Sequence, residues 1–130
     1  MSGKEILVDT NIVLYLLNGS DDIEKVLQGK DVYLSFMTEL ELIGYKGNTQ
    51  KQEEQIAELL KDCSVISMNN LIKDKYVEIR KKHSLKLADA VIAATSLAFD
   101  MPLITADKQF KTVNNLKLIA YQHNAKLTDD

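Results

Sequence analysis

The sequence predicts an α/β domain with a mainly parallel sheet of about five strands. Short apolar runs alternate with longer segments whose apolar residues recur at helical spacing, and this alternation is typical of strands joined by helical crossovers. The chain has 130 residues, 45% of them apolar, with only one Pro and five Gly. This length and composition predict one domain over residues 1–130 with a substantial core.

The first half of the chain predicts two strands and four helices. Residues 5–9 form a short apolar run that ends in Asp9, which is typical of a buried strand. The apolar segment after it reads as a helix that stops at Asn18 and Gly19. The predicted strands cover residues 5–9 and 32–36, and the predicted helices cover residues 10–17, 21–27, 38–45 and 50–61.

The second half predicts three strands and two helices. One helix ends in basic residues, which the negative end of a helix dipole favours. The other is apolar nearly all round, as expected of a buried helix. The predicted strands cover residues 64–66, 103–105 and 118–120, and the predicted helices cover residues 71–82 and 87–99.

Charge and cysteine content exclude several classes of protein. A net charge of −3 disfavours a protein that binds nucleic acid through phosphate contacts alone, but not a metal-dependent nuclease. No apolar run reaches the ~18 residues of a membrane span, and the N-terminus lacks the form of a signal peptide. The single cysteine, Cys63, cannot form an internal disulfide. We therefore expect a cytoplasmic protein.

Four acidic residues are predicted to converge on one edge of the sheet. Asp9 ends the first strand, Asp107 lies just past the fourth, and Glu41 lies in the helix after the second. Asp89 lies near the start of the apolar helix, where an ionised carboxylate is costly unless it is paired or binds metal. Because ligands of open parallel sheets bind beyond the carboxyl ends of the strands, these acids predict a site at that edge.

Each of three acids also has a purely structural interpretation. Asp9 is expected as the cap of the helix that follows it. Asp89 is expected to interact with the positive end of its own helix, and Asp107 to be a turn residue.

Glu41 has a structural alternative of its own. Thr38 and Glu41 have the spacing of a capping box, with Thr38 as the helix cap. Glu39 lies two positions earlier, on a different face of the helix, and competes with Glu41 as a site residue.

The absence of other motifs favours metal chemistry. The sequence has no glycine-rich phosphate loop of either common spacing. The haloacid-phosphatase pattern needs a second acid where this chain has Asn11. A cluster of acids without a phosphate loop or a nucleophile indicates a divalent metal that activates water.

One basic segment precedes Asp89 and is a candidate for RNA contacts. It guides a polyanion to the metal site in one interpretation and is an ordinary solvated helix face in the other. Its candidate RNA-binding residues are Arg80, Lys81, Lys82 and Lys86.

Four segments of the chain contain the acids: ILVDTNIV at residues 6–13, TELEL at 38–42, LADAVIAAT at 87–95 and LITAD at 103–107. Together they resemble the PIN-domain nucleases, and most closely the VapC toxins of prokaryotic toxin–antitoxin pairs. The likeness covers nearly the whole chain in the family's order and spacing.

The resemblance implies a three-layer α/β/α fold, a homodimer, inhibition by a cognate antitoxin and Mg²⁺- or Mn²⁺-dependent endoribonuclease activity. Asn11 and Thr105 match the family's polar supports of the carboxylates. Glu41 is preferred to Glu39 because the family's Thr-x-x-Glu-Leu falls on residues 38–42. The family's acidic, metal-binding quartet falls on Asp9, Glu41, Asp89 and Asp107.

Two alternatives come from other functional classes. A phospho-acceptor receiver domain has a similar length and an acidic metal site, but it needs an acidic pair after the first strand and an Asp at the end of the third. A PIN-like module that only binds partners is the other alternative, and the intact acids disfavour it.

Overall fold

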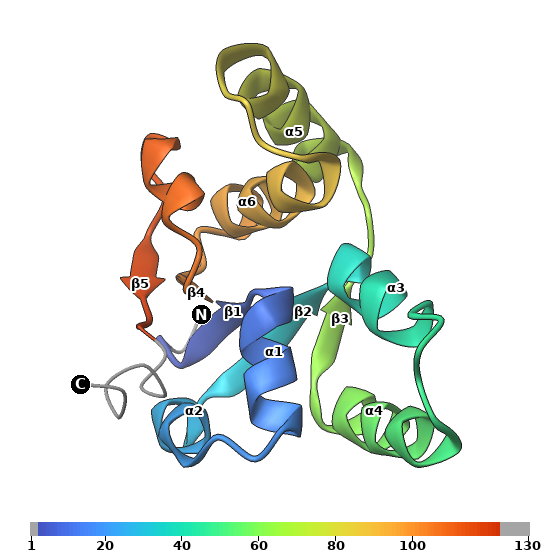
Figure 1. Ribbon diagram of the computed structural model, residues 1–130. Helices are drawn as coiled ribbons and strands as arrows, with labels where there is room; N and C mark the ends of the chain where they lie inside the picture. Colours follow the sequence, from blue (N-terminus) through green and yellow to red (C-terminus); the bar gives the residue numbers. More distant parts are fainter. Residues whose placement is uncertain (1–2, 123–130) are drawn as a thin grey trace, which may run out of the picture.

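A five-stranded parallel sheet lies at the centre of the computed structural model, which describes residues 3–122 (Figure 1). The strands are β1 Glu5–Val8, β2 Asp31–Ser35, β3 Ser64–Ile66, β4 Leu103–Thr105 and β5 Leu118–Ala120. The helices are α1 Thr10–Leu17, α2 Asp21–Leu27, α3 Phe36–Ile43, α4 Gln50–Asp62, α5 Asn70–Lys82 and α6 Leu87–Phe99, and a 3₁₀ helix, η1, covers Lys108–Thr112.

The strand order is β3-β2-β1-β4-β5, and all four neighbouring pairs are parallel. The chain builds outward from β1 to β2 and β3, and then from β4 to β5 on the other side of β1. The order therefore reverses between β1 and β4, which is where open parallel sheets bind ligands. Receiver domains have the order 2-1-3-4-5, so this topology excludes the receiver alternative.

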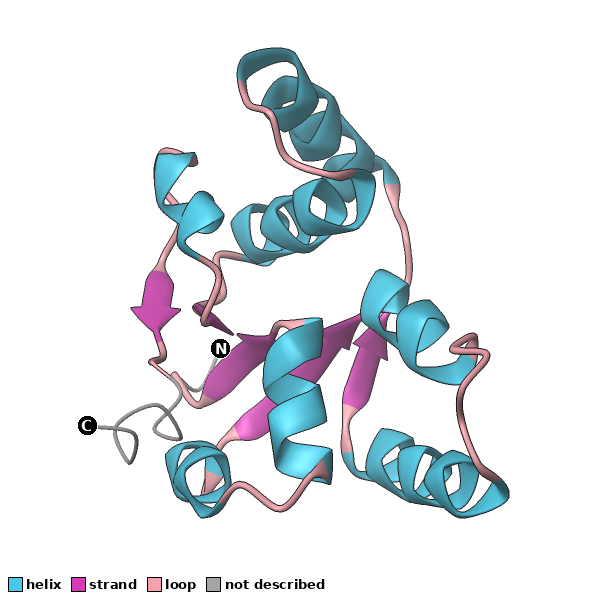
Figure 2. Ribbon diagram, viewed as in Figure 1, coloured by secondary structure: helices cyan, strands magenta, loops and turns pink. Residues whose placement is uncertain are grey.

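Two apolar cores lie on opposite faces of the sheet, as Figure 2 shows by the helices on both sides of the strands. Leu7 of β1 packs with apolar residues of α5 and α6. Ile6 and Val8 pack with residues of α1, α2, α3 and α4 on the other face. The alternation of side chains along a strand sends neighbours to opposite faces. The fold is therefore the expected three-layer α/β/α arrangement.

The start of α3 differs from the prediction, because the helix covers Phe36–Ile43 instead of residues 38–45. Ser35 caps it: its Oγ accepts a hydrogen bond from Met37 N at 3.1 Å. Thr38 is fully buried inside the helix and is not its cap. The prediction was wrong because Ser35 and Thr38 both carry a hydroxyl that can cap a helix, and both are followed by helical residues.

The capping box of this structure lies at the start of α4. Thr49 Oγ1 accepts a hydrogen bond from Gln52 N at 3.1 Å, and Gln52 Oε1 accepts one from Thr49 N at 2.8 Å. These reciprocal bonds satisfy two backbone donors that the first turn of a helix leaves free.

The remaining differences from the sequence prediction are small. The 3₁₀ helix η1 was not predicted, and β1 ends at Val8, so that Asp9 belongs to the turn into α1. Over residues 3–122, no helix combines the length and the apolar character that crossing a membrane requires. The single-domain organisation of residues 1–130 stays a prediction, since the first two and last eight residues lie outside the described part.

Candidate active site

The structure brings the four predicted acids to the carboxyl edge of the sheet, around the reversal of strand order. Asp9 directly follows β1, and Asp107 lies two residues beyond β4. Glu41 belongs to α3, which directly follows β2, and Asp89 lies in the first turn of α6. After burial, which is the largest cause, the charges of Glu41 and Asp107 contribute to the raised pKa values of both Asp9 and Asp89.

Asp9 is buried, with 4% of its surface exposed, and both of its carboxylate oxygens are hydrogen-bonded. Oδ1 accepts from Thr10 N at 2.8 Å, which makes Asp9 the cap of α1. Oδ2 accepts from Thr105 Oγ1 at 2.6 Å. Burial raises the pKa of Asp9, although both hydrogen bonds lower it. Each oxygen has a second lone pair, so capping leaves Asp9 able to bind a cation.

Glu41 is held by a pair of threonine hydroxyls. Thr10 Oγ1 donates to Glu41 Oε1 at 2.7 Å and lies 2.9 Å from Thr38 Oγ1. A hydroxyl carries one hydrogen, so Thr38 is the donor to Thr10. Sequence analysis missed both roles, although Thr10 directly follows Asp9. The side chain of Glu39 makes no hydrogen bond or ion pair with any residue in the described range. Its charge does not contribute to the pKa shifts of Asp9 and Asp89.

Asp89 is half-buried in the first turn of α6, and its carboxylate accepts no hydrogen bond from a residue within 3–122. Burial, followed by the charge of Asp9, raises its pKa to about 6. Lys86, the residue before α6, lowers this pKa but does not cancel the rise. A carboxylate stabilised mainly by a helix N-terminus has a lowered pKa, so this purely structural interpretation does not account for Asp89.

Thr105 connects Asp107 to Asp9. Its hydroxyl donates to Asp9 and accepts from Asp107 N at 3.0 Å, so one buried side chain fixes both acids relative to each other. Asp107 Oδ1 accepts from Gln109 N at 2.9 Å and caps η1. Asp107 therefore has the structural role of a turn residue and also lies at the acidic edge.

Two groups of predicted site residues lie outside this network. Asn11 is exposed in α1, and its side chain forms no hydrogen bond with another described residue. Of the basic segment, Lys86 acts on the pKa of Asp89. The others lie in the last turn of α5, where Arg80 Nη1 donates to Tyr76 Oη at 3.2 Å.

The donor set suits a divalent cation by its chemistry. Carboxylate oxygens are the hard ligands that Mg²⁺ and Mn²⁺ prefer, and a cation beside Asp89 would reverse the repulsion that raises its pKa. Within the described residues, no three Asp, Glu, His or Cys side chains already lie close enough to hold one ion. Mg²⁺ usually keeps several waters and binds through one or two carboxylates, so it does not need three such side chains.

Comparison with known proteins identifies the fold family. A PIN-domain model matches residues 6–116. No curated protein sequence matches the chain. A toxin–antitoxin complex from Klebsiella pneumoniae contains a chain that is 28% identical, with a TM-score of 0.77 over 91% of this chain and 99% of that one.

Two further solved structures are similar. VapBC-1 from nontypeable Haemophilus influenzae matches with 25% identity and a TM-score of 0.76, over 89% of this chain and 97% of that one. VapBC2 from Rickettsia felis, bound to a DNA fragment from its promoter, matches in fold with 21% identity and a TM-score of 0.81, over 91% of this chain and 99% of that one. The chain therefore belongs to the PIN-domain family, and within it to the VapC type of nuclease.

Proposed function

We propose that the protein is a divalent-metal-dependent endoribonuclease that hydrolyses RNA phosphodiester bonds at its acidic edge. The observation that carries this proposal is that carboxylates from four separate parts of the fold meet at one edge of the sheet, where burial and then the charges of the neighbouring acids raise the pKa values of Asp9 and Asp89. A fold gains no stability from such crowding, so a cation and a substrate are the best physical reason for it. The catalytic, metal-binding acids are Asp9, Glu41, Asp89 and Asp107.

We propose Mg²⁺ or Mn²⁺ as the cofactor, held by these four carboxylates. A bound divalent cation supplies positive charge for the transition state and makes water more acidic. Thr105 holds the carboxylate of Asp9 in one orientation, and Thr10 does the same for Glu41. Asn11 is proposed to orient a carboxylate once substrate is bound, while Arg80, Lys81, Lys82 and Lys86 are proposed to contact RNA phosphates.

We propose further that the protein is the toxin of a toxin–antitoxin pair, inhibited by a cognate antitoxin. The similar chains belong to toxin–antitoxin complexes, which supports this assignment. A homodimer and a cytoplasmic location are part of the same proposal.

Cleavage of a mixed RNA pool tests the proposed activity. Purified protein is expected to cut internal bonds with Mg²⁺ or Mn²⁺ and to be inactive in EDTA. Restoring the metal after chelation is the control for irreversible damage. Cleavage that persists in EDTA would contradict the metal-dependent mechanism.

Glu41→Gln and Glu39→Gln form a matched pair that tests the assignment of the fourth acid. They remove the same charge from one helix, two positions apart, but Glu41 accepts the hydrogen bond from Thr10. We expect Glu41→Gln to lose cleavage and Glu39→Gln to retain it. The reverse result would move the site to Glu39.

A second candidate is a PIN-like module that binds partners without catalysis. It is favoured by one observation, that no three acids in the described part of the chain already form a metal site. This alternative predicts no metal-dependent cleavage of any RNA and no change in melting temperature with Mn²⁺.

A further inference from the structure

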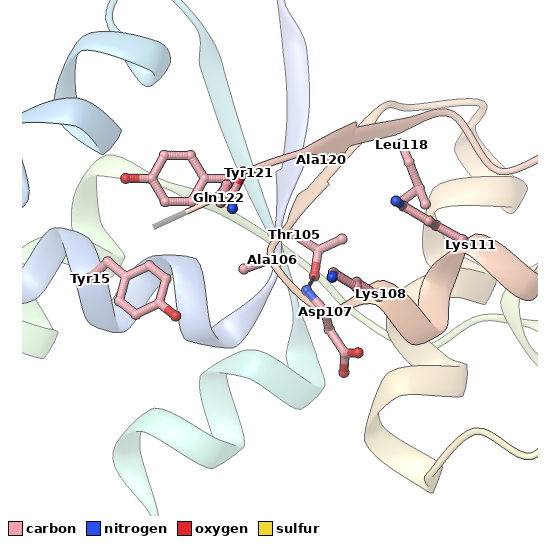
Figure 3. A pocket seen from close by; sticks show the side chains of 10 residues that line it. All are labelled: Tyr15, Thr105, Ala106, Asp107, Lys108, Lys111, Leu118, Ala120, Tyr121 and Gln122. Atoms are coloured by element: carbon pink, nitrogen blue, oxygen red, sulfur yellow. Dashed lines mark hydrogen bonds between the residues drawn. The ribbon is translucent and has the colours of Figure 1, made fainter. Parts of the chain in front are cut away.

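A hollow of about 540 Å³ opens beside the acidic edge, between α1, β4, η1 and the end of β5 (Figure 3). Asp107 lines it, so the hollow is continuous with the proposed catalytic site. In Figure 3, Tyr15 and Tyr121 lie at one end and Lys111 at the other, with Lys108 between them. Its volume falls within the ~300–1,000 Å³ that is usual for small-molecule sites.

The two lysines give the hollow a cationic side. Lys108 and Lys111 are exposed, and neither forms an ion pair with a residue in the range 3–122. They lie three residues apart in a 3₁₀ helix, where such residues share one face. Their ammonium groups can therefore reach one anion from the same face of η1. A phosphate of a bound RNA strand is such an anion, next to acids that would otherwise repel it.

The two tyrosines give the hollow an aromatic side that the sequence does not reveal. Tyr15 comes from α1 and Tyr121 follows β5, yet their ring centroids lie 6.2 Å apart with 44° between the ring planes. Both side chains pack on the core beneath them while also lining the hollow, so their rings are held in place. Fixed aromatic rings beside a cationic groove are how proteins bind the bases of single-stranded nucleic acid.

We propose that this hollow is a nucleotide subsite. It holds the nucleotide next to the cleaved bond, with the phosphate against Lys108 and Lys111 and the base against Tyr15 and Tyr121. The subsite rests on the proposed ribonuclease function and extends it, because it assigns nucleotide preference to residues outside the acidic cluster. An acidic protein segment would match the lysines but would leave the aromatic side without a base to stack.

Binding of a labelled RNA pentanucleotide of mixed sequence tests the cationic side. Fluorescence anisotropy is measured with Ca²⁺ present, and a gel checks that the RNA stays intact. The double variant Lys108→Gln/Lys111→Gln is expected to raise Kd about tenfold and to reduce the salt slope by about 0.7, as the loss of one neutralised phosphate on a single strand predicts. Lys25→Gln/Lys51→Gln, exposed lysines of α2 and α4, changes the net charge equally and is expected to bind as the wild type does.

Cleavage specificity tests the aromatic side. Tyr15→Leu removes the ring but keeps an apolar side chain on the core, whereas Tyr15→Phe keeps the ring. We expect Tyr15→Leu to raise KM about tenfold with little change in kcat, and to relax base preference at one position beside the cut. Tyr15→Phe is expected to retain both properties. Tyr45→Leu, at a tyrosine that is 67% exposed in the segment after α3, is the matched surface control.

The outcomes separate the subsite from the nuclease function. If the lysine double variant binds the pentanucleotide as tightly as wild type, the subsite is wrong, even in a protein that cleaves RNA. If binding weakens but no metal supports cleavage by wild type, the hollow binds RNA, but the nuclease function is wrong and the hollow is not a subsite for cleavage. Unchanged RNA binding together with weaker binding of an oligoglutamate peptide would assign the hollow to an acidic protein segment and overturn the proposal. Circular dichroism and melting temperature show that each variant is folded.

Discussion

Two helices, α1 and α6, begin at the acidic edge, and each brings one aspartate to it in a different way. Asp9 precedes α1, is 4% exposed, and has both oxygens hydrogen-bonded by Thr10 and Thr105. Asp89 lies inside the first turn of α6 and is half-buried. Its carboxylate accepts no hydrogen bond from a residue that the structure describes. The residue that precedes α6, Lys86, provides no side-chain cap.

This contrast distinguishes an acidic residue that stabilises the fold from one whose position only a function explains. Asp9 stabilises the fold through its capping bond, so its place would be explained even without a function. Asp89 gives the fold nothing of the kind, and burial and the charge of Asp9 raise its pKa to about 6. Acids with no structural benefit are therefore the more informative markers of a site.

The largest expected effect is on catalysis, where the two aspartates should behave alike. Asp9→Asn and Asp89→Asn are each expected to reduce RNA cleavage at least about a hundredfold, because each removes a carboxylate from the proposed metal-binding set. Asp74→Asn, at an exposed position on α5, is the matched control. Full activity in Asp89→Asn, with an unchanged circular dichroism spectrum, would remove Asp89 from the site.

Metal binding is expected to give the next largest effect, on stability. A cation that binds only the folded protein stabilises it by about 2.7 kcal/mol at a hundredfold excess over Kd. Mn²⁺ should therefore raise the melting temperature of the wild type, and should raise that of Asp89→Asn less. No shift in the wild type up to millimolar Mn²⁺ would contradict a metal site at this edge.

Asp9→Ala should then show the structural role that Asp89 lacks. It removes the cap of α1 and leaves the Thr105 hydroxyl without its acceptor, so we expect a loss of about 1 kcal/mol in EDTA. Relief of the raised pKa of Asp9 acts in the opposite direction and keeps the loss small. Urea unfolding measures the difference, and a gain in stability would show that repulsion outweighs capping.

Asp89→Asn is expected to change stability in the opposite direction. The folded-state pKa of Asp89, about 6, lies above the ordinary value of 3.8, so the folded protein binds more protons between these values. The free energy of unfolding of the metal-free wild type should therefore fall as pH rises from about 4 to 6. Urea unfolding in EDTA should show that Asp89→Asn is more stable than wild type at pH 7 and loses this advantage near pH 4. A variant that is less stable at pH 7 would restore the helix-end interpretation of Asp89.

The smallest effect concerns the cation nearest to this acid in sequence. Lys86 lowers the pKa of Asp89, so Lys86→Gln should move that pKa further upward. A carboxyl NMR titration in EDTA measures this change. Lys82→Gln, at the end of α5, is the matched control and should leave the pKa unchanged.

The fold prediction succeeded where the signal was local. All five strands and six α-helices were expected, and α2 and α6 have the predicted bounds. The start of α3 was misplaced because Ser35 and Thr38 both carry a hydroxyl, and only the backbone conformation decides which one caps. The edge at which the acids lie could be expected from the order of the chain, because Asp9 and Asp107 follow strands, Asp89 begins a helix and Glu41 lies in the helix after β2. Their role as a catalytic site stays a prediction.

The sequence by itself determined the type of each strand and α-helix, and the edge at which the acids gather. Hydrophobic period and helix ends depend on residues close together in the chain, and in a parallel sheet every strand ends at the same edge. Only the tertiary structure decided the strand order, the bond from Thr105 to Asp9 across 96 positions, and the pairing of Tyr15 with Tyr121. Such contacts arise when separate elements pack on a common core, and no local pattern records which side chains then meet.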